Sequence, residues 1–234
     1  MMELTERQLN LLIAFPIFIA IAIILGLLIL RRDPKYWGNR LFFLSFTFNG
    51  LALLFNLFYL FSQVKAQVIT LNIISILMIN IATISMVLAI LVLYRGENAV
   101  IGSKTTLYFL IAVIIVLTIH VLLPGGVSTR TTVSVPPEIV PLWGLHFGIY
   151  QMVFSEVMFI AVYYISIKLY KELSDEMKRK FKRFLFGGVF INLTLLSVSI
   201  DNMYIFANYE IIGGLLNLGA LIGVILIYYG IVRK

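Results

Sequence analysis

The sequence lacks most of the residues that carry enzymatic chemistry. It contains no cysteine and only two histidines among 234 residues, which excludes disulfides, thiolate metal sites, cysteine nucleophiles and histidine-rich metal centres. It also contains no serine-nucleophile elbow, no zinc-protease motif and no phosphate-binding glycine loop. We therefore expect neither catalysis nor a bound cofactor or metal.

Charge is scarce as well. Only 12% of the residues are charged, and 11 acidic and 18 basic side chains cannot cover the surface of a soluble domain of this length. The net charge of +7 is compatible with a nucleic-acid partner, but the basic residues gather in the connections between apolar stretches. This distribution favours the lipid bilayer as the partner and argues against nucleic acid.

Hydrophobic residues are abundant, at 61% of the chain. A helix needs about 20 apolar residues to cross a hydrocarbon core of about 30 Å, and seven stretches come close to or exceed this length. They are residues 9–30, 41–62, 68–94, 106–123, 147–170, 184–206 and 211–232. Residues 1–10 lack the basic start of a signal peptide, so we expect the first stretch to remain as a helix. The sequence therefore predicts an all-α, multi-pass membrane protein, with residues 1–234 as a single seven-helix bundle.

The basic residues also predict an orientation. All but three of the 18 lie in the first, third and fifth connections, at the C-terminus or, for Lys168, just inside the end of the fifth stretch, and the three on the other side are Arg7, Lys65 and Arg130. Because Lys and Arg favour cytoplasmic loops, the N-terminus should lie outside the cell membrane and the C-terminus in the cytoplasm.

Two connections have distinctive sequences. Residues 124–146 form the longest external connection, and its Thr/Val pattern is compatible with either a short hairpin or an extended segment, acting as a lid or as a plain linker. Residues 174–183 should extend the sixth helix into the cytoplasm, because Ser174 can cap it and acidic residues follow. Its basic residues would contact anionic lipid or a cytoplasmic signalling protein; they are Lys178, Arg179, Lys180, Lys182 and Arg183.

Polar residues within the apolar stretches are candidates for function because they are costly in a bilayer. Six asparagines are expected in the bundle core, where they can also simply join helices: Asn49, Asn56, Asn72, Asn80, Asn192 and Asn217. The pair Gly219-xxx-Gly223 should permit the close approach of a neighbouring helix.

Glu156 lies near the middle of the fifth stretch, with no Lys or Arg at a comparable depth. We expect asparagines or water as its partners, and either a functional role or a structural one as a neutral acid. Other polar residues gather toward the external side: Asp201, Asn202, His120, His146 and Tyr204. Together with Glu156 at its floor they predict an outward-facing polar vestibule that binds a ligand, although Tyr204 is equally typical of the interfacial aromatic belt.

Two features carry a family resemblance. The third stretch ends in Leu93-Tyr94-Arg95-Gly96, and a basic run from Met177 leads into the sixth stretch, ending at Gly187-Gly188. This pattern resembles the seven-transmembrane N-terminal sensory region of prokaryotic histidine kinases. The resemblance implies a sensory module, and because the sequence ends at Lys234 without a kinase, we expect it to signal through a separate chain. It carries over no ligand and no binding residue.

Three functions remain open at this point. A sensory or receptor-like module for an unknown ligand is preferred, a small transporter or channel is the alternative, and a membrane subunit of a larger complex is the third. A retinal protein is excluded, because residues 211–232 contain no lysine for a Schiff base.

Overall fold

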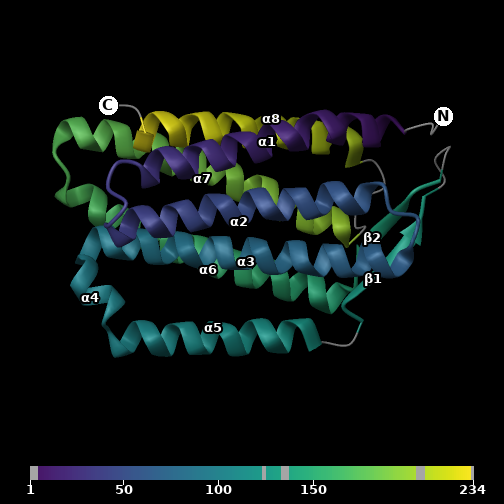
Figure 1. Ribbon diagram of the computed structural model, residues 1–234, viewed down its shortest axis with the longest axis horizontal. Helices are drawn as coiled ribbons and strands as arrows, with labels where there is room; N and C mark the ends of the chain where they lie inside the picture. The colour runs from purple at the N-terminus through teal and green to yellow at the C-terminus, as the bar shows by residue number, and fades with distance from the viewer. Residues whose placement is uncertain (1–4, 123–124, 133–136, 204–208, 233–234) are drawn as a thin grey trace.

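The computed structural model describes residues 5–122, 125–132, 137–203 and 209–232, without the side chains of residues 6–7, 120–122, 209–217 and 231–232. This part of the chain is almost entirely helical (Figure 1). The helices are α1 (Glu6–Leu30), α2 (Trp37–Leu60), α3 (Lys65–Arg95), α4 (Glu97–Ile101), α5 (Lys104–Leu122), α6 (Leu145–Glu172), α7 (Asp175–Asn202) and α8 (Tyr209–Ile227), followed by a π-helical turn, η1 (Tyr228–Val232). Two strands, β1 (Val127–Thr131) and β2 (Ile139–Trp143), lie between α5 and α6.

Five of the described helices are long and apolar enough to cross a membrane: α1, α2, α3, α6 and α7. Helices α5 and α8 contain shorter apolar stretches over described residues, Lys104–Ile119 and Leu218–Gly230. These helices coincide with the seven predicted stretches, but some ends differ. Helix α2 ends at Leu60 and α7 at Asn202, short of the predicted residues 62 and 206, and residues 204–206 lie outside the described part. The architecture is that expected of a helical membrane protein.

The contacts between helices follow a closed cycle, in which α1 packs on α2, α2 on α3, α3 on α6, α6 on α7, α7 on α8, and α8 with η1 returns to α1. Helix α3 is the most buried. In its most apolar stretch 61% of the residues are buried, against 22–33% in the other four long helices. Helix α5 lies at the edge of the bundle and packs mainly on α6 (Figure 1). Helix α3 is therefore covered by α2, α6 and the two strands, while α5 exposes large apolar side chains on most of its surface.

The long connection before α6 forms a short β-hairpin. Strands β1 and β2 pair antiparallel, with Val127 opposite Trp143 and Thr131 opposite Ile139. Of the two conformations left open by the sequence, the hairpin is the one adopted. It lies at the end of the bundle where α1 begins, and the chain ends at the opposite end (Figure 1).

Helices α7 and α8 approach each other closely at Gly223 of the predicted pair, but not at Gly219. A Cβ atom added to Gly187 would lie 2.5 Å from the Gly223 carbonyl oxygen, and one added to Gly223 would lie 2.8 Å from the Gly187 carbonyl oxygen. A Cβ atom on Gly219 would meet only Phe190, at an ordinary 3.6 Å. The close contact thus pairs one glycine from each helix, and Gly219 takes no essential part in it.

Candidate functional site

The best-formed polar contact inside the bundle joins α3 to α6. The amide of Asn80 donates to Gln151 Oε1 at 3.2 Å, and the Gln151 amide donates to Asn80 Oδ1 at 2.8 Å. The two side chains are only 1% and 4% exposed. Because each amide satisfies the other, the pair can lie in an apolar interior without a large desolvation cost. Gln151 is a residue that the sequence reasoning missed.

A second contact fixes the hairpin to α3. Trp143, the last residue of β2, donates its indole N–H to Asn72 Oδ1 at 2.9 Å, and both residues are buried. Its ring packs edge-on against Phe147 at the start of α6, and the two form a small apolar cluster with Ile76. Met203, just beyond α7, packs against the same cluster. The hairpin is therefore held by α3, α6 and the end of α7.

Glu138, immediately before β2, joins the hairpin to the first helix. The Thr5 hydroxyl, at the N-cap of α1, donates to a carboxylate oxygen of Glu138, which is buried. The backbone N–H of Glu138 donates to the Thr132 hydroxyl at 2.9 Å. Gln8 completes the Thr5 capping box and donates to the Leu60 carbonyl at 3.0 Å. The start of α1 thus joins the hairpin through Thr5 and the end of α2 through Gln8.

Glu156 lies near the middle of α6 and faces α7. Asn192 Nδ2 donates to Glu156 Oε2 at 3.2 Å, so an asparagine partner of the kind expected is present. The Tyr163 hydroxyl, two turns along α6, comes close to Gly188 of α7. The Tyr163 hydroxyl and Asn192 Oδ1 are buried with no hydrogen-bond partner among the described residues. This group combines one acid with donors and acceptors, so it can hold a proton or a polar ligand group.

The predicted vestibule residues do not form one cluster with Glu156. Asp201 and Asn202 are the last two residues of α7, and Asp201 is nine positions beyond Asn192, or about 14 Å along the helix. His146 lies at the start of α6 and is exposed, ten positions before Glu156, about 15 Å away along that helix. Glu156 therefore lies at a different level along the helices from Asp201, Asn202 and His146.

The remaining predicted residues are placed only in part. Asn49 and Asn56 are half-buried on α2, and Asn56 Oδ1 has no hydrogen-bond partner within the described residues. The side chains of His120 and Asn217, and all of Tyr204, lie outside the described part. No group of three or more residues able to hold a metal ion occurs among the residues that were described.

Comparison with known proteins gives no family assignment: no family model and no curated protein matches the chain.

Proposed function

We propose that this chain is a seven-helix membrane protein of the cell membrane, with its N-terminus outside, that acts as a sensory or receptor-like module for a separate cytoplasmic partner. The five long apolar helices support the membrane placement, and α5 and α8 supply the two further spans. The distribution of basic residues supports the orientation, with the hairpin outside and the start of α7 inside.

The observation that carries the sensory proposal is the attachment of the hairpin to the spanning helices. Strand β2 runs into α6 through Gly144 alone, and Trp143 is hydrogen-bonded to Asn72 of α3. Helices α3 and α6 both continue to the opposite end of the bundle. A ligand that moves the hairpin would therefore move two helices that reach the cytoplasmic side, as transmembrane signalling requires.

This coupling can be tested by replacing Trp143 with phenylalanine, which removes the indole donor and keeps an aromatic ring. Spin labels at Ser103→Cys, which follows α3 and α4, and at Ser174→Cys, which follows α6, are both expected on the cytoplasmic side and report the separation of the ends of α3 and α6. We expect Trp143→Phe to shift that distance on the order of 1–2 Å, the size of typical helix shifts. Ser128→Ala is the control, because it removes only an exposed hydrogen bond within the hairpin. An unchanged distance in a folded Trp143→Phe protein would contradict the coupling.

A transporter remains the second candidate because Glu156 and Asn192 form a polar pair near the middle of two long apolar helices. The purified protein alone in liposomes, screened for ion and solute flux, decides between the two. The sensory proposal predicts no flux above that of empty liposomes. Flux that disappears in Glu156→Gln would overturn it, provided that flux persists in Glu172→Gln, which removes an exposed carboxylate from the end of the same helix.

A further inference from the structure

The basic run at the start of α7 divides into two groups. Lys178 pairs with Asp175 at 3.4 Å, and Lys180 pairs with Glu176 at 2.9 Å, so the first turn of the helix neutralises these two. Arg179, Lys182 and Arg183 form no salt bridge in the ranges that the structure describes, and Arg179 only attracts Glu176 electrostatically from farther away. Three cations at one end of the bundle therefore remain available to an anion.

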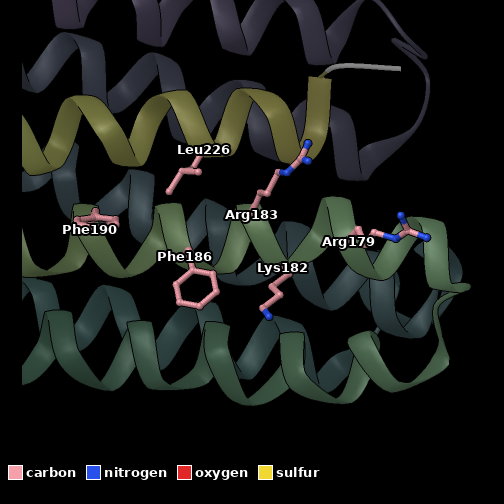
Figure 2. A pocket seen from close by; sticks show the side chains of 6 residues that line it. All are labelled: Arg179, Lys182, Arg183, Phe186, Phe190 and Leu226. Carbon is pink, nitrogen blue, oxygen red and sulfur yellow. The ribbon is translucent and has the colours of Figure 1, made fainter.

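The same three residues line one groove. The groove has a volume of about 330 Å³, and its other walls are Phe186 and Phe190 of α7 and Leu226 of α8 (Figure 2). No acidic residue lines it. Arg183, Phe186 and Phe190 follow one another at helical spacing, so one stripe of α7 passes from charged to apolar. From Arg179 to Phe190 the stripe covers eleven positions, about 16 Å along the helix.

The position of Leu226 in this groove depends on how closely α7 and α8 approach. The contact between Gly187 and Gly223 brings the two helices together one turn from the groove. The Lys182 ammonium also lies 5.9 Å from the Phe186 ring, where charge and apolar surface meet. The groove thus offers cations at the membrane surface and an apolar wall at the depth of the acyl chains.

We propose that this groove binds one anionic phospholipid, with its phosphate at Arg179, Lys182 and Arg183 and one acyl chain along Phe186, Phe190 and Leu226. The assignment rests on the membrane placement in the proposed function, though not on the sensory role. Basic pockets between transmembrane helices on the cytoplasmic side suit anionic headgroups. An acidic protein segment would satisfy the charges but could not follow the apolar wall into hydrocarbon, so a lipid fits the whole groove better.

The test uses the purified full chain, freed of lipid in a neutral detergent, which makes the result independent of its orientation in a membrane. Bound lipid is counted by native mass spectrometry during titration with phosphatidylglycerol, with phosphatidylcholine of the same chains, or with inorganic phosphate. We expect one phosphatidylglycerol to bind at least tenfold more tightly than either of the other two, because three basic contacts and an acyl contact act together.

Variants locate the site. Arg179→Gln/Lys182→Gln/Arg183→Gln should reduce phosphatidylglycerol binding at least tenfold. The matched control, Arg31→Gln/Lys35→Gln/Lys104→Gln, removes three exposed cations from the other connections at that end and should leave it unchanged. Phe186→Ala should weaken phosphatidylglycerol binding, and Arg183→Gln alone replaces the triple variant if that protein does not fold.

Three results would overturn the proposal. An equal loss of phosphatidylglycerol binding in the control variant would mean that the lipid is attracted by the overall positive charge of this end of the protein. Tight binding of inorganic phosphate would mean that the groove is a simple anion site. Unchanged binding in the folded Arg179, Lys182 and Arg183 variants would place the lipid elsewhere. None of these outcomes bears on the flux and spin-label tests of the proposed function, so the two can fail separately.

Discussion

Replacing Gly187 with alanine should lower the unfolding temperature of the purified protein by up to about 8 °C. The added Cβ atom would lie 2.5 Å from the Gly223 carbonyl oxygen and 3.0 Å from the Ile227 backbone nitrogen. These are backbone atoms, so the clash is relieved only if α8 moves away from α7. Overpacking of this kind costs about 1–3 kcal/mol, and the better helix propensity of alanine offsets up to about 1 kcal/mol of it, so the net loss reaches about 2 kcal/mol when the clash is at the upper end of that range. For a chain of this length each kcal/mol corresponds to about 2–4 °C.

The same substitution at Gly219 is the matched control. A Cβ atom there meets only Phe190 at 3.6 Å, an ordinary contact. Gly219→Ala should therefore leave the unfolding temperature unchanged or raise it slightly, because only the propensity term remains. Thermal unfolding followed by circular dichroism in one detergent compares the two variants directly. Equal effects at the two positions would contradict the close contact between α7 and α8.

The helices were predictable because a bilayer imposes a simple requirement of length and hydrophobicity. Ser174, Asp175 and Glu176 also predicted the extension of α7 beyond its apolar stretch, and α7 does begin at Asp175, although the Ser174 side chain at the N-cap makes no capping hydrogen bond. Helices α1, α2 and α3 begin a few residues before their apolar stretches, since a helix continues through polar residues wherever its backbone hydrogen bonds are not interrupted. Helix α3 ends directly after Arg95, because Gly96 has a φ of +85°, which is not a helical conformation.

The hairpin could not be predicted with the same assurance. Its pairing depends on tertiary anchors, the contact of Trp143 with Asn72 and that of Glu138 with Thr5, which join residues far apart in the chain. Composition alone gives no sign of such contacts, because tryptophan and glutamate in an external loop are also typical of interfacial and solvated positions.

The candidate site was predictable by residue type but not by partner. The cost of burying polar groups identified Asn80, Asn192 and Glu156 as residues that need partners. It did not identify Gln151, although a glutamine amide within an apolar helix carries a similar cost and could have been found by the same reasoning. Which faces meet depends on the order of helices around α3, and periodicity within one helix does not determine that order.

The chain contains no cysteine, so single cysteines can map its path through the membrane without background. Four serines lie in successive connections and are exposed or half-exposed: Ser62, Ser103, Ser128 and Ser174. Each substitution of serine by cysteine replaces only the side-chain oxygen with sulfur, and the unsubstituted protein is the negative control. Because the basic residues favour the cytoplasm, each cysteine should be either fully accessible or inaccessible from outside the cell. The cysteines before and after a spanning helix should give opposite results.

The most direct test of the account is therefore reaction of these four variants with a membrane-impermeant maleimide in intact cells. We predict that Ser62→Cys and Ser128→Cys react in intact cells, whereas Ser103→Cys and Ser174→Cys react only after permeabilisation. This alternation requires α3, α5 and α6 to cross the membrane, with the hairpin outside and the lipid groove at the cytoplasmic leaflet. Reaction of Ser128→Cys and Ser174→Cys from the same side would show that α6 does not span, and a fully reversed pattern would contradict the proposed orientation.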